Sequence, residues 1–206
     1  MTEQILTLLQ SIYDKLEGHV KTIFLSGSST CSYIKHPHDI DIFIYMRDRT
    51  SILKCARQVE TELKQIKTEI PSAAVIFSLQ DRYEILFNGD FEEKFNEHPN
   101  RCGFLCYLYE FPLIQVLVGE DEDNLRDVDI FKQKEKVIVA LKYFMNKNKE
   151  SNKFLYHILT TLYILQNNSY QLTEEQINNI NIAHDEEDKE AIAALYQWAK
   201  TEVEKL

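Results

Sequence analysis

The sequence lacks the features that would place it in a membrane or in a secretion pathway. No apolar run approaches the about 20 residues that cross a bilayer. Residues 1–4 are not a basic region leading into an apolar core, as a signal peptide would be. Low-complexity tracts are missing too, and the hydrophobic fraction of 44% is ordinary for a globular protein. We therefore expect a globular cytoplasmic protein with no membrane partner.

Basic residues are too few for a strong grip on long nucleic acid. The 23 Lys and Arg residues are outnumbered by 33 Asp and Glu, which gives a net charge of −10. Proteins that bind long nucleic acid usually carry a basic stripe, whereas these lysines are scattered among acids. This argues against a processive polymerase and favours a small or single-site acceptor, with a tRNA or other RNA end left open.

Cysteine is scarce as well, and its spacing excludes the common zinc patterns. The chain has four cysteines and no Cys-x2-Cys pair, and its histidines complete no zinc motif. Cys102 and Cys106 fall on one face of a strand-like segment, where buried thiols are favoured over a pair of metal ligands. Free thiols are typical of a reducing, cytosolic setting.

What the sequence does contain is a polar turn and an acidic pair between two apolar runs. The first run ends at Leu25, and the small residues 26–29 follow it. After nine intervening residues comes Asp39-Ile40-Asp41, at the head of an apolar run that reaches Met46. Residues two apart on a strand share a face, so Asp39 and Asp41 should point one way and the isoleucines the other.

Together the turn and the acidic pair favour a site for a metal ion and a phosphate. Paired carboxylates repel each other and are costly to desolvate unless a cation neutralises them, and oxygen ligands suit a hard ion such as Mg²⁺ or Mn²⁺. Gly27 lets the backbone approach a ligand. Ser28 and Ser29 offer donors, and a helix expected over residues 28–35 would present its positive N-terminus. The alternative is a plain loop before an exposed acidic strand end.

In order and spacing, Gly27-Ser28 and Asp39-Ile40-Asp41 resemble the signature of the DNA polymerase beta-like nucleotidyltransferase superfamily. The resemblance implies an α+β fold with a mixed sheet and flanking helices. It also implies transfer of a nucleotide from an NTP donor to an acceptor hydroxyl. Asp39 and Asp41 would hold Mg²⁺ (or Mn²⁺), and the Gly-Ser turn would bind the phosphates.

The superfamily has a third carboxylate on a neighbouring strand, and Glu84 is the candidate here. It lies in the expected strand 83–88, and the alternative is an edge glutamate paired with Arg82 or a lysine. The string 83–87, Tyr-Glu-Ile-Leu-Phe, is similar to a branch of stand-alone nucleotidyltransferases from bacteria and phages. That branch has an Asn-Pro-rich stretch where this chain has Leu79-Gln80-Asp81-Arg82.

The C-terminal third changes to helical periodicity. We expect a catalytic domain over residues 1–128 and a helical bundle over 129–206, with the site in a cleft between them. Lys153 and His157 are spaced i, i+4 and so share a helix face. With Lys142, they are candidates to contact the triphosphate, base, ribose or acceptor. A solvated lysine and a packing histidine are at least as well supported.

One departure from the superfamily pattern keeps a second function open. Many relatives carry an arginine directly after the Gly-Ser pair, where this chain has Ser29. A non-catalytic nucleotide-binding or regulatory module with the same fold is therefore the alternative. Other expected elements are helices 3–17, 51–68 (capped by Thr50 or Ser51) and 174–182 (with a capping box from Thr173 to Gln176), strands 20–26 and 73–79, and a hairpin of 103–109 with 113–118.

Overall fold

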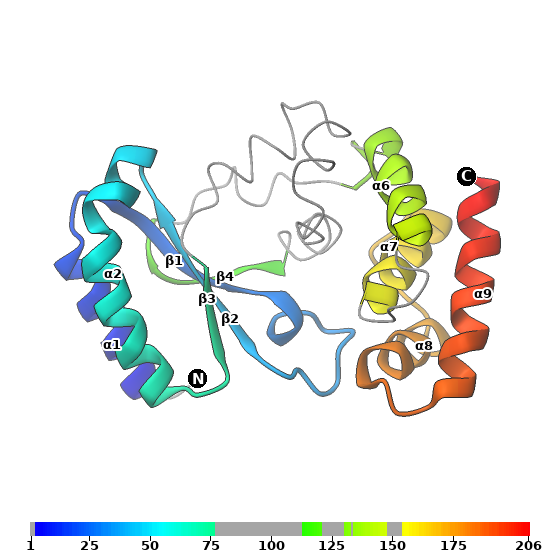
Figure 1. Ribbon diagram of the computed structural model, residues 1–206, viewed down its shortest axis with the longest axis horizontal. Helices are drawn as coiled ribbons and strands as arrows, with labels where there is room; N and C mark the ends of the chain where they lie inside the picture. Colours follow the sequence, from blue (N-terminus) through cyan, green and yellow to red (C-terminus); the bar gives the residue numbers. More distant parts are fainter. Residues whose placement is uncertain (1–2, 77–112, 121–129, 133, 148–153) are drawn as a thin grey trace. The chain divides into compact units, whose positions relative to one another are not determined.

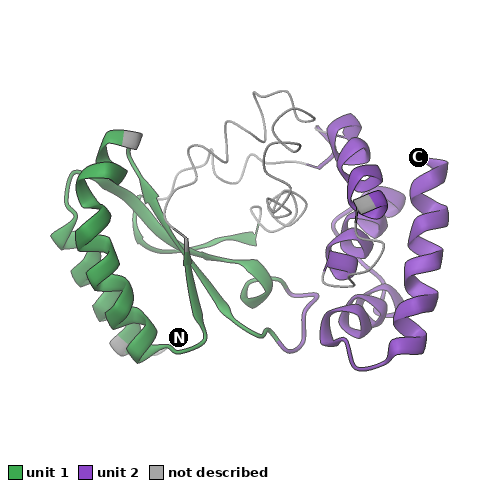
Figure 2. Ribbon diagram, viewed as in Figure 1, with its two compact units in different colours: residues 1–31, 37–94, 113–126 green, residues 32–36, 95–112, 127–206 purple. Residues whose placement is uncertain are grey.

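The computed structural model describes residues 3–76, 113–120, 130–132, 134–147 and 154–206 (Figure 1). The chain divides into two compact units (Figure 2). Unit 1 comprises residues 1–31, 37–94 and 113–126, and unit 2 comprises residues 32–36, 95–112 and 127–206. The short segment 32–36 thus belongs with the C-terminal helices, although the residues on either side of it belong to unit 1.

Unit 1 is built on a mixed sheet, to which the described residues contribute four strands. Its strands are β1 (Val20–Ser26), β2 (Ile40–Met46), β3 (Ala73–Ile76) and β4 (Gln115–Gly119), in the order β3-β2-β1-β4. β1 is antiparallel to both β2 and β4, while β2 is parallel to β3. The strands lie where the apolar runs predicted them, as far as the described residues reach.

Two helices cover one face of this sheet. They are α1 (Glu3–Lys15) and α2 (Arg49–Glu69), which lie side by side in Figure 1. Ile42 and Ile44 of β2 pack into the core that these helices form with the sheet, together with partly buried Ile40. Because side chains alternate along a strand, Asp41 and Phe43 face the opposite side. The predicted division of β2 into an isoleucine face and an acidic face is confirmed.

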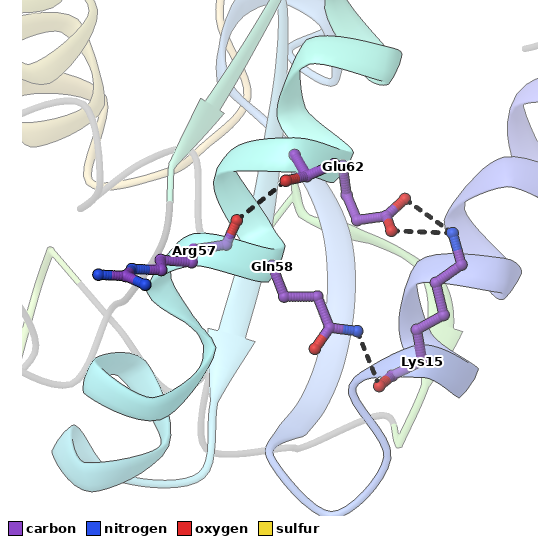
Figure 3. A network of polar contacts seen from close by, with 5 residues as sticks. Lys15, Arg57, Gln58 and Glu62 are labelled. Atoms are coloured by element: carbon purple, nitrogen blue, oxygen red, sulfur yellow. Dashed lines mark hydrogen bonds and ion pairs between the residues drawn. The ribbon is translucent and has the colours of Figure 1, made fainter.

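A small polar network joins α1 to α2 (Figure 3). Lys15 Nζ lies 2.8 and 3.0 Å from the two carboxylate oxygens of Glu62, which is nearly buried. Gln58 Nε2 donates to the Lys15 carbonyl at 3.2 Å, which gives a partner to an acceptor at the end of α1. These contacts fix the helix pair on which β1 and β2 rest.

The predicted N-cap of α2 was wrong. Asp48 is the cap, and its carboxylate accepts from the backbone N–H of Ser51 at 2.6 Å. A carboxylate accepts this bond well and also favours the positive end of the helix. The pKa of Asp48 is accordingly lowered, chiefly by the hydrogen bond from the Ser51 backbone. Ser51 is instead buried, with its hydroxyl 3.0 Å from His19 Nδ1.

The described residues of unit 2 form the helices α6 (Lys134–Lys147), α7 (Leu155–Asn167), α8 (Glu174–Asp185) and α9 (Lys189–Lys205). Most of α7 is buried, which suits a central helix of the bundle. The capping box between Thr173 and Gln176 is confirmed, and α8 runs three residues beyond its predicted end. None of the helices that the structure describes is both long and apolar enough to cross a membrane.

Candidate active site

The site begins where β1 meets β2. Ser26, the last residue of β1, lies opposite Asp41 in the antiparallel ladder. Gly27 follows with φ +76°, a backbone conformation that favours glycine. A Cβ placed on Gly27 would lie 1.9 Å from Oδ2 of Asp41 and 2.9 Å from its Cγ. The Asp41 carboxylate therefore occupies the space that any other side chain at position 27 would need.

The Asp41 carboxylate is electrostatically strained. Burial, and secondly the nearby charge of Asp39, raises the pKa of Asp41 to about 6. Asp39 itself is exposed, directly before β2. A cation beside these two groups would offset both the lost hydration and the mutual repulsion. The sequence predicted this pair, and in the structure Asp41 is partly buried whereas Asp39 is exposed.

The turn after β1 is tighter than predicted. Gly27–Ser29 form one turn of 3-10 helix, and the described residues 30–39 contain no helix, so the expectation of a helix over 28–35 was wrong. Ser29 Oγ donates to the Ser26 carbonyl and Thr30 Oγ1 to the Gly27 carbonyl, both at 3.1 Å. Such side-chain bonds compete with helix formation. A phosphate at this place would meet a turn, without the dipole of an α-helix.

Beyond the turn, the loop joins unit 2 through a residue that the sequence analysis missed. Asn181 Nδ2 donates to the Tyr33 carbonyl at 2.7 Å, and its Oδ1 accepts from the Lys35 backbone N–H at 2.8 Å. The Tyr33 hydroxyl donates to the Tyr170 carbonyl. The carboxamide of Asn181 thus pairs with the loop backbone as a strand would. The available signal was a polar residue four positions after Ile177, on the buried face of α8.

Another residue without a predicted role is Ser26. Its side chain is fully buried, and its hydroxyl has no hydrogen-bond partner among the residues that the structure describes. The signal was again positional, because the residue before the Gly-Ser turn falls opposite Asp41 once β1 and β2 pair.

Of the predicted site residues, the structure brings together Gly27, Ser28, Ser29, Asp39 and Asp41. These five lie in unit 1. Together they supply oxygen donors from carboxylates and hydroxyls, with no sulfur or imidazole, and this donor set fits a hard divalent cation. Ser26, the residue opposite Asp41 in the ladder, adds one more hydroxyl oxygen.

Two further predicted residues fall within the described part of unit 2. Lys142 is exposed on α6 and His157 is buried in α7, both in unit 2. Burial, and secondly His184, lowers the pKa of His157 to about 3, so this imidazole is neutral. The ring of Tyr156 lies against it, with 3.7 Å between the centroids. Glu84 and Lys153 lie outside the described residues, and their roles stay predictions.

No family model and no curated protein sequence matches the chain. Among solved structures, it is similar to the spectinomycin adenyltransferase AAD(9) from Enterococcus faecialis, determined with ATP and spectinomycin. The TM-score is 0.57 at 10% sequence identity, and the match covers 99% of this chain and 100% of the other. An identity this low shows the fold alone. It confirms the predicted α+β fold of the nucleotidyltransferase type, with a mixed sheet followed by a helical region.

Proposed function

We propose that the protein is a metal-dependent nucleotidyltransferase that moves an NMP from an NTP to an acceptor hydroxyl. The observation that carries the proposal is the contact between Gly27 and Asp41. The resemblance in sequence predicted that a Gly-Ser turn and an acidic strand would form one site. In the structure the partly buried Asp41 carboxylate of that strand lies directly over the glycine of that turn.

Asp39 and Asp41 are the residues that would hold the divalent cation. A cation bound there supplies charge that neutralises the triphosphate and favours loss of the acceptor proton. Gly27, Ser28 and Ser29 approach the phosphates, since the turn presents backbone and hydroxyl groups beside the carboxylates. Lys142, Lys153 and His157 are retained as nucleotide-binding candidates, although the His157 side chain is buried.

The proposed reaction is a single displacement at the α-phosphorus of the NTP. The acceptor oxygen attacks the α-phosphorus of the NTP, the bond from that phosphorus to the bridging oxygen breaks, and pyrophosphate leaves. Glu84 is proposed as the third carboxylate and as the group that takes the acceptor proton. The acceptor class is a small molecule, an RNA end or a protein hydroxyl. Membership of the stand-alone bacterial and phage branch is part of the same proposal.

The test is a binding panel with ATP, GTP, CTP and UTP, each with and without Mg²⁺ or Mn²⁺, by calorimetry and thermal shift. The Asp39→Asn/Asp41→Asn variant should lose metal-dependent binding while its circular dichroism is unchanged. Asp14→Asn, which alters an exposed carboxylate on α1, is the matched control and should bind as the parent protein does.

Each outcome of the panel separates the two candidate functions. Metal-dependent binding of one NTP identifies the donor, and the labelled nucleotide then reports transfer to candidate acceptors. Nucleotide binding that persists in the double Asn variant without any turnover would support the non-catalytic module instead. Binding of no NTP under any condition would overturn the proposal.

A further inference from the structure

The side chain of Ser26 is an anomaly in the core of unit 1. It is 0% exposed, and its Oγ has no hydrogen-bond partner in the described part of the chain. A serine that precedes a helical turn ordinarily accepts a bond from a backbone N–H of that turn. Ser26 occupies this N-cap position but makes no such bond. The carbonyl of the same residue, in contrast, is used by Ser29 Oγ.

The position of Ser26 shows which group its hydroxyl accompanies. It lies directly opposite Asp41, and directly opposed residues of an antiparallel pair place their side chains on the same face, with Cβ atoms about 5 Å apart. Two residues earlier, Phe24 stacks on Phe43 with 5.2 Å between the ring centroids, which confirms that these positions share the face turned away from the helices.

A second buried hydroxyl on β1 does have a hydrogen-bond partner. Thr22 lies on the same strand and the same face and is equally buried. Its hydroxyl donates to the Val118 carbonyl at 3.0 Å. A buried hydroxyl on this strand can therefore be hydrogen-bonded within the protein, as that of Thr22 is and that of Ser26 is not. A buried hydroxyl left without a partner destabilises the protein and calls for an explanation, such as a bound ion or water.

We propose that Ser26 is a positioning residue of the cation site, whose hydroxyl binds a water molecule in the hydration shell of the divalent cation held by Asp39 and Asp41. Small hard cations such as Mg²⁺ keep several of their waters when they bind to proteins. A hydroxyl next to one of the ligands orients such a water, and groups of this outer kind commonly change metal affinity by about 10- to 100-fold. The inference rests on the proposed function, since it requires the cation.

The test measures the Mn²⁺ affinity and the Tm of Ser26→Ala. If Ser26 has this role, the substitution should lower the affinity and raise the Tm. Mn²⁺ affinity, followed by electron paramagnetic resonance of the free ion, should fall by about tenfold. The Tm in EDTA should rise by about 3 °C, because alanine removes a buried polar group that has no partner in the cation-free protein. A hydroxyl with a merely structural role would not produce this pair of effects.

Thr22→Val is the matched control, because it removes a buried hydroxyl from the same strand that does have a partner. Its Tm should fall by about 3 °C and its Mn²⁺ affinity should stay within about twofold of the parent value. A fall in Tm for Ser26→Ala like that of the control would overturn the inference.

Two further arms separate this inference from the proposed function. If the parent protein binds Mn²⁺ and Ser26→Ala binds it equally well, the role of Ser26 is refuted and the cation site stands. If Mn²⁺ binding is equal but ATP binds more weakly to the variant, Ser26 serves the phosphates and the inference also fails. If the parent protein binds no Mn²⁺ at all, the cation site itself is refuted.

Discussion

Gly27 and Asp41 share a space that holds only one side chain. The Oδ2 atom of Asp41 lies 1.9 Å from the place that a Cβ on residue 27 would take, while the φ of Gly27 is +76°. Glycine is favoured at this position for two reasons: the positive φ, and the Asp41 carboxylate that occupies the place of a Cβ. At Gly18 only the first of these reasons, the positive φ, applies. Gly18 has φ +79° and nothing within 4 Å of its notional Cβ.

This comparison gives the first prediction. Gly18→Ala should cost about 1 kcal/mol of unfolding free energy, the price of a left-handed residue. Gly27→Ala should cost roughly 3 kcal/mol, because it adds displacement of the Asp41 carboxylate to the same backbone strain. Urea denaturation measures both. Adding Asp41→Ala should recover much of the difference in a double-mutant cycle. Equal losses for the two glycines would contradict the observed contact.

The second prediction concerns the pH dependence of stability. The pKa of Asp41 is raised to about 6 from its usual 3.8. Between these two pH values the folded state therefore holds a proton that the unfolded state has released. The stabilising contribution of the protonated group is therefore complete below pH 3.8 and is lost as the pH rises through 6. In EDTA, Asp41→Asn should be more stable than the parent at pH 7.5 and closer to it at pH 4.5. A stability difference independent of pH would show that Asp41 titrates normally.

The third prediction tests the polar network between α1 and α2. Glu62→Gln should lower the unfolding free energy by about 1–2 kcal/mol, since it weakens a two-oxygen bond to Lys15 at a nearly buried position. Glu60→Gln breaks a pair with Lys64 at 3.6 Å in which both side chains are mostly exposed. That control should change stability by less than about 0.5 kcal/mol. Similar losses in the two variants would mean that burial of Glu62 adds nothing.

The fourth prediction concerns His157. Its pKa is lowered to about 3, whereas an unfolded chain has the ordinary value of about 6.5. The stability gained by keeping it neutral is present above pH 6.5 and is lost as the pH falls through that value toward 3. His157→Phe should remove this acid sensitivity, by up to about 1.4 kcal/mol per pH unit. His36→Gln, which replaces an exposed histidine, is the control variant. An unaltered slope in His157→Phe would refute the buried neutral role.

The sequence predicted those parts of the site that depend on local periodicity. Alternation along 40–46 separated Asp41 from the isoleucines, and the resemblance to the nucleotidyltransferase signature predicted that the Gly27 turn and the acidic strand would form one site. It failed over 28–35, where Ser29 and Thr30 bond to nearby carbonyls in place of a helix. Propensity cannot weigh such local bonds against the helix, because each alternative satisfies the same backbone groups.

Other features depend on partners far away in the chain, and no local pattern contains them. Asn181 binds Tyr33 and Lys35 across 148 and 146 residues, so nothing near either segment announces the pairing. That the Ser26 hydroxyl has no partner among the described residues likewise becomes visible only when β1 and β2 are paired in register. The orientation of a strand face follows from its own sequence, whereas the satisfaction of its polar groups follows from tertiary structure.

The bonds from Asn181 also bear on the order in which the molecule is completed. Closing a chain segment of 148 residues carries an entropic cost on the order of 4 kcal/mol, which the pairing alone does not offset. During synthesis, residues 32–36 leave the ribosome early and reach their final partners only after α8 has emerged. The loop that leads into the acidic strand therefore gains its hydrogen bonds to Asn181 only after α8 has been synthesised. A nascent chain that stops before residue 181 contains the acidic pair but lacks these bonds to the loop.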